Sequence, residues 1–298
     1  MPRTTLLAVL VLAGSASLAA AQNPDSVTFT RQRLAEGLYL LQGSGGNIAL
    51  SAGKDGVFLI DDDEQPLTAK LKAAVAGVST GPIRFVINTH WHGDHTGSNA
   101  ALGAEGTIIV AQENVRQRMS RDQVNKVFKM TVPASPAVAL PVVTFGETMT
   151  LYLNGDTVDI IHARAAHTDG DAIIHFRKAN VIHAGDTFFN GLYPYIDVGS
   201  GGSLDGMIDA TDKILSMADD QTKIIPGHGP LGNRAQLKGY RDMLAAVRLR
   251  FSRARGQGLT AEQVVNANLL ADYDSTWGKG WLTPAQFAAI TYAAVPRP

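Results

Sequence analysis

Short apolar segments separated by polar turns occupy the first third of the chain, a pattern typical of β-strands. Three such segments, at 38–43, 47–52 and 56–63, predict consecutive strands. Apolar residues at helical spacing over 66–77 then predict a helix. The next segment, 83–89, is almost wholly apolar and predicts a strand that is buried on both faces.

The remaining pattern predicts further strands and then a mostly helical C-terminal part. A proline-rich connection at 131–141 separates the two halves. Thr-x-x-Gln sequences at Thr260 and Thr283 are the capping-box pattern of helix N-termini. Because strands and helices alternate, we expect an α/β protein with mixed sheets covered by helices. The predicted elements are strands at 106–112, 149–153, 157–164, 172–177, 179–185 and 223–228, a helix from about Glu113, and helices at 204–218, 233–255, 260–271 and 283–295.

The first 21 residues have the layout of a secretory signal peptide. A basic start at Arg3, an apolar run and a small-residue end at Ala21 indicate cleavage after Ala21. The alternative is a membrane anchor, but this apolar run is too short to span a bilayer well. We therefore expect residues 22–298 to form a single domain with a helical C-terminal tail. This domain would be periplasmic or secreted, with no stable membrane anchor after cleavage.

Composition narrows the classes of partner and of metal ligand. The whole chain carries a formal charge of −1, and removal of Arg3 with the signal makes it −2. A nearly neutral chain argues against nucleic acid as the main partner, so we expect a small-molecule substrate. The sequence contains no cysteine. Any metal site must therefore be built from histidine and carboxylate side chains.

Four candidate metal ligands lie together in THWHGDHTGSNA, directly after the apolar segment 83–89. His90 and His92 are two positions apart, so in extended backbone both point to the same side. Asp94 and His95 follow where the chain turns, and can point to a second position a few ångströms away. Imidazole and carboxylate ligands without thiolate suit Zn²⁺ best, with Fe or Mn as competitors.

Three later stretches supply candidate partners for this cluster. His167 lies in AAHTDGD, Asp186 in IHAGDTFF and His228 in IIPGHGP, each near a strand end and beside glycine or another turn former. Taken alone, each histidine would more often be structural than a ligand, but together they indicate a metal site. The remaining histidines match no ligand position and are expected to be structural or on the surface: His162, His175 and His183.

The order H-x-H-x-D-H, then HT, GD and GHG, resembles the metallo-β-lactamase superfamily over about residues 35–240. The resemblance implies an αββα sandwich of two mixed sheets flanked by helices, with the site at one edge. It also implies two metal ions, with Zn²⁺ expected at both positions. The implied ligands are His90, His92 and His167 for one ion, Asp94, His95 and His228 for the other, and Asp186 as the bridge.

The stretch VFLIDDD resembles an early strand of the same family that ends in aspartate. Asp61 would then hydrogen-bond a ligand histidine or the metal-binding loop and fix its orientation. The next two carboxylates, Asp62 and Asp63, are expected to be solvated turn residues.

The implied reaction is hydrolysis. Two divalent ions can lower the pKa of a shared water to about 7, and the resulting hydroxide would attack the substrate. Asp94 would orient this hydroxide as well as bind metal. Three alternatives stay open: an iron-dependent oxidoreductase of the persulfide dioxygenase type, a thioesterase of the glyoxalase II type, and a non-catalytic binding module.

Two departures from the family's antibiotic-cleaving members bear on the substrate. In those members a cysteine or serine occupies the position of Asp186 and a lysine follows three residues later, where this chain has Phe189. The segment LLQGSGGNIAL also leaves little room for a long substrate-covering loop. We therefore expect a small amide, lactone or ester as substrate, with β-lactams accepted but not the dedicated substrate.

Aromatic residues follow Asp186 in FFNGLYPYIDVGSGG. A loop beside a metal site can line a substrate pocket, although the same side chains can simply pack the loop against the domain. Arg164 and Lys223 could bind an anionic substrate, but no pattern selects them. The candidate pocket residues are Phe189, Tyr193 and Tyr195, with Phe188 as a further aromatic of the same loop.

Overall fold

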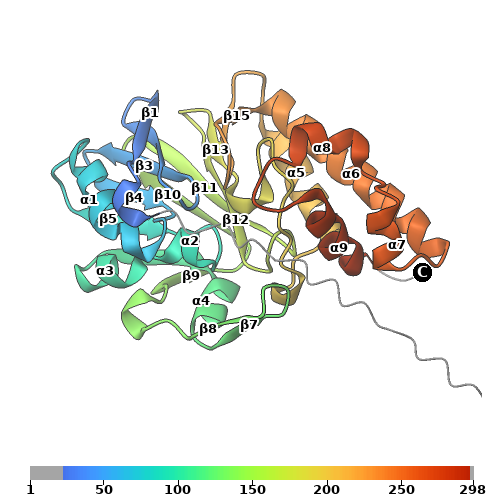
Figure 1. Cartoon of the computed structure of the whole chain (residues 1–298). Helices are drawn as coiled ribbons and strands as arrows, with labels where there is room; N and C mark the ends of the chain where they lie inside the picture. The colour runs from blue at the N-terminus through green and yellow to red at the C-terminus, as the bar shows by residue number, and fades with distance from the viewer. Residues whose placement is uncertain (1–22, 296–298) are drawn as a thin grey trace, which may run out of the picture.

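The computed structural model describes residues 23–295, in which two β-sheets pack face to face between outer helices (Figure 1). The first sheet contains, in spatial order, β1 (Thr30–Ala35), β2 (Leu38–Gln42), β3 (Ile48–Gly53), β4 (Gly56–Ile60), β5 (Ile83–Ile87), β6 (Ile108–Gln112) and β9 (Val143–Phe145). The second contains β10 (Thr148–Leu153), β11 (Asp156–Ala163), β12 (Asp171–Phe176), β13 (Val181–His183), β14 (Lys223–Ile225) and β15 (Gly232–Asn233). The expected αββα sandwich is confirmed. The expected signal peptide lies outside the described residues, and the single-domain assignment stays a prediction.

Successive side chains along a strand point to opposite faces of the sheet, so each sheet packs against the other sheet on one face and against helices on the other face. In β3, Ala49 packs into the core between the sheets, whereas Leu50 packs outward with Leu71 and Val75 of α1 (Thr68–Ala76). On the other side, α5 (Leu204–Met217) and α6 (Arg234–Gly256) cover the second sheet. The remaining helices of the first half are α2 (Gly93–Thr96), α3 (Asn99–Ala104) and α4 (Glu113–Met119).

The C-terminal helices are α7 (Ala261–Asn266), α8 (Ala271–Trp277) and α9 (Pro284–Ala294), and they pack against the same core cluster as α5 and α6. Both expected capping boxes are present, at Thr260 and Thr283. The helix predicted at 260–271 is too long, because Asn268 adopts a left-handed φ of 43° and separates α7 from α8. No helix within residues 23–295 is long and apolar enough to span a membrane.

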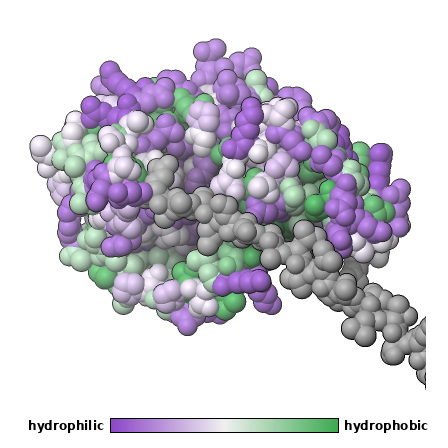
Figure 2. Space-filling model, in the orientation of Figure 1, coloured by the Kyte–Doolittle hydropathy of each residue, from purple (hydrophilic) through white to green (hydrophobic). Residues whose placement is uncertain are grey.

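Four strand regions were not predicted, and one of them, β15, has only two residues directly before α6. β1 is mostly exposed and polar, so it has no apolar pattern. β9 is short and largely exposed, and it lies beyond the proline-rich connection. A small hairpin, β7 (Gln123–Asn125) and β8 (Met130–Val132), follows α4, and neither of its three-residue strands contains a buried residue. Figure 2 shows a largely hydrophilic upper surface, and apolar residues exposed among polar ones in the lower part, where Figure 1 places this hairpin.

Strand direction brings loops of both sheets to one edge. In the first sheet β4, β5 and β6 are parallel, so their C-terminal ends lie together. In the second sheet β13 and β14 are parallel and end at the same edge. The loops that follow β4, β5, β13 and β14 therefore meet, and they carry the sequence's histidine and aspartate motifs.

Candidate metal centre

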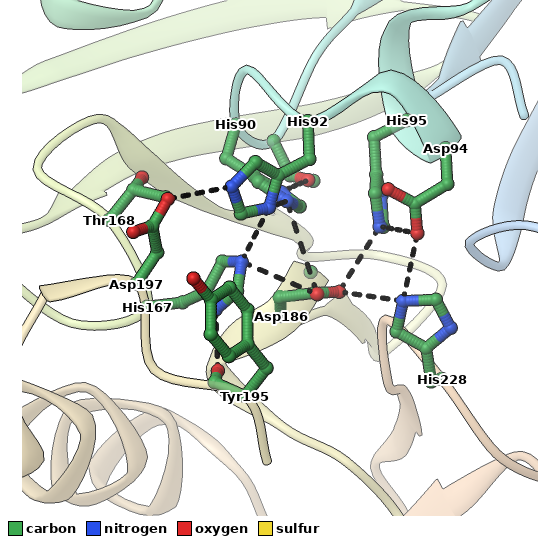
Figure 3. A network of polar contacts seen from close by, with 12 residues as sticks. His90, His92, Asp94, His95, His167, Thr168, Asp186, Tyr195, Asp197 and His228 are labelled. Atoms are coloured by element: carbon green, nitrogen blue, oxygen red, sulfur yellow. Dashed lines mark hydrogen bonds and ion pairs between the residues drawn. The ribbon is translucent and has the colours of Figure 1, made fainter. Parts of the chain in front are cut away.

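The seven predicted ligands converge at this edge (Figure 3). Four come from the loop and short helix α2 after β5, and the others follow β11, β13 and β14. The structure therefore brings together every residue that the sequence proposed as a metal ligand, and their role as metal ligands stays a prediction. The converging residues are His90, His92, Asp94, His95, His167, Asp186 and His228.

Two groups of donor atoms are distinguishable. In the first, His92 Nδ1 lies 3.1 Å from His90 Nε2 and 2.9 Å from His167 Nε2. In the second, Asp94 Oδ2 lies 3.4 Å from His95 Nε2 and 3.2 Å from His228 Nε2. The grouping is the one that the family resemblance implied.

Asp186 lies between the groups and presents one oxygen to each. Its Oδ2 is 3.5 Å from His167 Nε2 and 3.9 Å from His90 Nε2. Its Oδ1 is 3.2 Å from His95 Nε2 and 3.5 Å from His228 Nε2. Gly227 makes this approach possible, because a Cβ there would collide with Asp186 Oδ1.

Outer hydrogen bonds fix the tautomers of the first group. His167 Nδ1 donates to the Tyr195 carbonyl at 2.8 Å, and His92 Nε2 donates to Asp197 Oδ2 at 3.0 Å. Since a carbonyl and a carboxylate only accept, both protons must lie on these outer nitrogens. The inner nitrogens, His92 Nδ1 and His167 Nε2, then carry no proton, and their lone pairs point toward each other.

His90 is held in the same way through Thr89. The Thr89 hydroxyl donates to Asp61 Oδ2 at 2.8 Å, so it must accept from His90 Nδ1 at 3.1 Å. His90 Nε2 is therefore a third inward lone pair. Lone pairs this close repel unless a cation lies among them, so the group fits a metal ion.

The second group also fits a cation. Asp61 Oδ2 accepts from His95 Nδ1 at 2.8 Å, which turns the lone pair of His95 Nε2 inward. Within residues 23–295, neither His95 Nε2 nor Asp186 Oδ1 has a hydrogen-bond partner, although both atoms are buried. Buried polar atoms are normally satisfied, so this unpaired set requires a binding partner.

The two ligand groups differ in the pKa values of their histidines. Burial lowers the pKa of His167 to about 4 and that of His90 well below its usual range, so both are neutral ligands. Desolvation would lower the pKa of His228 too, but the Asp186 and Asp94 carboxylates raise it to about 10. Against the effect of burial, the imidazoles of His95 and His228 hold the pKa of Asp94 well below the usual range, and the same two imidazoles, with those of His167 and His90, do so for Asp186. Metal binding at the second group must therefore displace protons.

Asp61 lies where the sequence placed it, behind the ligands. It is fully buried and accepts from the backbone N–H of Thr89 at 2.7 Å as well as from the two side chains above. The expectation for Asp62 and Asp63 is wrong, because both are fully buried. Asp62 Oδ1 accepts from the Ser98 N–H, and Asp63 Oδ1 accepts from the Gly45 N–H; these bonds hold the ligand loops in place.

A pocket of about 300 Å³ opens onto the metal centre. Phe189 and Tyr195 line it as predicted, and Phe189 stacks on His228 at 5.3 Å. Tyr193 does not line it, because its ring stacks on Phe287 at 4.2 Å and its hydroxyl donates to Asp274. Phe188 likewise packs away from the pocket, against Tyr240.

The remaining candidates have structural contacts. His162 Nε2 lies 2.9 Å from the Asp169 carbonyl oxygen, and His183 Nε2 lies 2.9 Å from that of Asn47. His175 is half-buried on β12. Of the two cations considered for an anionic substrate, Arg164 pairs with Glu147 and Lys223 donates to the Leu34 carbonyl. None of the five lines the pocket.

Sequence analysis missed several residues that contact the ligands or the pocket. Asp197 binds His92, and its only sequence signal is an acid in the glycine-rich loop after Asp186. Phe128 in the β7–β8 hairpin and Trp281 between α8 and α9 line the pocket from distant parts of the chain. Nothing local in either segment predicts this placement.

Replacing Asp197 by asparagine is expected to weaken zinc binding about 10- to 100-fold, the usual effect of losing a carboxylate behind a ligand histidine. Against the effect of burial, the His92 hydrogen bond lowers the pKa of Asp197 to about 2, so the group is a carboxylate at neutral pH. Competition with a zinc chelator measures the loss. Asp212→Asn, at an exposed carboxylate paired with Arg241, is the control. Equal zinc affinity in both variants would contradict the assigned role.

Comparisons with known proteins agree with this geometry. The family model described as the metallo-beta-lactamase superfamily matches residues 42–228. The hydroxyacylglutathione hydrolase of Polaromonas sp. (strain JS666 / ATCC BAA-500) is 30% identical over 172 residues, 56% of this chain and 57% of that protein. The alpha subunit of 2,4-dinitroanisole O-demethylase from Nocardioides sp. (strain JS1661) is 24% identical over 178 residues, 59% of this chain and 50% of that protein. The chain thus spans about half the length of the curated relatives it matches.

Solved structures share the fold at low sequence identity. A metallo-beta-lactamase from Pontibacter korlensis superposes with a TM-score of 0.60 and 16% identity, covering 73% of this chain and 99% of that one. The sec-alkylsulfatase Pisa1 from Pseudomonas sp. gives 0.65 and 18%, covering 89% of this chain and 50% of that one. The family match extends from the end of β2 to His228 and includes all seven converging residues, so the chain belongs to the metallo-β-lactamase superfamily.

Proposed function

We propose that the chain is an exported, dinuclear zinc-dependent hydrolase of a small, uncharged ester, lactone or amide. The superfamily consists mostly of metal-dependent hydrolases. The observation that carries the dinuclear proposal is the carboxylate of Asp186, which presents one oxygen to each of two separate three-residue ligand groups. Export rests on the signal-peptide pattern of the sequence.

Zinc is the proposed metal because the donors are imidazoles and carboxylates and the sequence has no cysteine. His90, His92 and His167 would hold one ion, Asp94, His95 and His228 the other, and Asp186 both. When bound, the pair would supply Lewis acidity and a water of lowered pKa. Iron in the same donors would instead support the oxidoreductase alternative.

The chain's own residues position the reactants. Asp94 lines the pocket and its side chain is 32% exposed, so it can accept a hydrogen bond from the attacking water and orient it. Asp197 and the Tyr195 carbonyl hold His92 and His167 in place. The aromatic lining of the pocket limits access of bulk water to the reacting carbonyl.

The lining favours an uncharged substrate. Among the described residues, no lysine or arginine lines the pocket, so apart from the proposed metal ions it offers no lysine or arginine cation to a substrate carboxylate. This disfavours β-lactams, and it disfavours glutathione thioesters, which carry carboxylates. The thioesterase alternative nevertheless keeps one supporting observation, the 30% identity to a hydroxyacylglutathione hydrolase.

Removal of metal by a chelator is expected to abolish hydrolysis, and two equivalents of Zn²⁺ per chain should restore it. The assay compares 4-nitrophenyl acetate, a γ-lactone, an anilide, a β-lactam and a glutathione thioester, with metal content measured in parallel. The uncharged substrates should be cleaved fastest. Activity that survives chelation would sink the proposal, and purification with one iron and no zinc would favour the oxidoreductase.

A further inference from the structure

Three aromatic rings from distant segments meet at the mouth of the pocket. Phe128 belongs to the β7–β8 hairpin, Tyr195 follows Asp186 in the chain, and Trp281 lies between α8 and α9. The Phe128 ring centroid lies 5.0 Å from that of Tyr195 and 5.6 Å from that of Trp281. Tyr195 and Trp281 are 6.0 Å apart. We call these three residues the aromatic clamp.

The clamp is continuous with the metal centre. The Tyr195 ring lies 6.2 Å from His92 and 5.9 Å from His167, and its backbone carbonyl accepts from His167. Figure 3 shows the Tyr195 ring beside the first ligand group. Asn125 donates to the Tyr195 hydroxyl at 2.9 Å and so ties the hairpin to this ring. The three rings pack against one another and form one wall of the pocket, so a molecule bound at the metals would extend along the clamp residues.

The rest of the lining is also apolar on the hairpin side. Met130 and Val132 of β8 contribute, and Trp91 also lines the pocket. Trp281 is 44% exposed and Met130 49%, an unusual exposure for such side chains beside a polar site. Large apolar groups that stay in water at a pocket mouth gain stability when a ligand covers them.

On the basis of the proposed function, we propose that the aromatic clamp binds the apolar acyl or aryl group of the substrate and sets its length preference. A pocket of about 300 Å³ is at the small end of ligand sites, about 300–1,000 Å³, so it fits one chain or ring rather than a larger scaffold. The substrate class is thus an uncharged ester or lactone with a medium-length alkyl or an aryl substituent.

The test uses the zinc-loaded full chain and 4-nitrophenyl esters from acetate to decanoate. Each methylene that enters the clamp should raise kcat/KM about fourfold until the pocket is full. Trp281→Ala and Phe128→Ala should flatten this dependence, so that their loss of kcat/KM relative to the parent grows with the length of the ester. Trp281→Phe should restore most of the dependence of kcat/KM on ester length. Tyr152→Ala, at an aromatic residue that is 78% exposed on β10 and away from the pocket, is the matched control.

Binding gives a readout that does not depend on turnover. 2-Undecanone, which cannot be hydrolysed, should bind the zinc-loaded and the metal-free chain, and Trp281→Ala should weaken its binding about tenfold by calorimetry. If no ester is cleaved but this loss is seen, the proposed function fails and the clamp stands. If esters are cleaved without any length dependence, and both alanine variants bind the ketone like the parent, the clamp is overturned.

Discussion

Replacing His90 or His228 by alanine is expected to abolish hydrolysis while leaving a folded protein. Each variant removes one inward-facing donor from a different ligand group, so each should lose mainly one metal position. We expect kcat to fall at least about 10³-fold, equivalent to roughly 4 kcal/mol of transition-state stabilisation. The fold should survive because the core between the sheets does not include these side chains.

Metal analysis and thermal melting separate a lost site from a lost fold. Each variant should retain about half of the metal that the parent binds, which is one zinc ion per chain if the proposed two-metal centre is correct. His175→Ala is the matched control, since His175 is a half-buried histidine on β12 that contacts none of the seven residues. Full turnover by either ligand variant, with a melting temperature like that of the parent, would refute the assigned ligands.

The convergence of the candidate ligands was predictable from sequence because most of them follow a recognisable strand end. His90 and His92 follow β5, Asp186 follows β13 and His228 follows β14, and parallel strands bring these ends together. The pattern of apolar segments along the chain is enough to predict that these residues meet, since the loops after parallel strands lie at the same edge of a sheet.

Side-chain direction in irregular loops was not predictable. Tyr193 and Tyr195 are two positions apart in the same loop, yet one packs against Phe287 and the other lines the pocket. Asp62 and Asp63 follow a buried strand, and their hydrogen bonds to loop N–H groups could not be read from the chain. In each case a long-range contact, absent from local spacing, decides the outcome.

The aromatic clamp was not predictable for the same reason, because its residues are far apart in the sequence. The strands of the β7–β8 hairpin are only three residues long, too short to show a clear hydrophobic period, and Trp281 follows the unpredicted helix α8. These segments are adjacent only because the C-terminal helices pack against the second sheet. Sequence periodicity thus predicted most strands and helices, and the family resemblance implied the sandwich, whereas the pocket depends on how separate segments cover its edge.

Replacing Asp61 by asparagine is expected to impair both metal positions at once. Asp61 Oδ2 accepts from His95 Nδ1 and from the Thr89 hydroxyl, which in turn accepts from His90. An amide can keep the bond to the Thr89 N–H, but its NH₂ group would then face the His95 N–H. His95 would have to move its proton to Nε2, where the lone pair for the metal is needed.

The expected loss of zinc affinity is larger for Asp61→Asn than for Asp197→Asn, because Asp61 orients candidate ligands of both groups. Zinc affinity should fall about 100-fold, at the upper end of the range for such partners. For comparison, amide replacement of a buried aspartate that fixes a histidine tautomer costs about 10⁴ in kcat in the serine-protease triad. We therefore expect hydrolysis by the Asp61→Asn variant to be nearly undetectable even with excess zinc.

Asp62→Asn is the matched control for this effect. Asp62 is as deeply buried as Asp61, and burial raises its pKa well above the usual range. Its Oδ1 accepts only from the Ser98 N–H, a bond that an amide oxygen can replace. Chelator competition and turnover should therefore match the parent for Asp62→Asn and fall sharply for Asp61→Asn. Similar zinc affinity in the two variants would show that burial of a carboxylate behind the loop, rather than control of the histidine tautomers, is what Asp61 contributes.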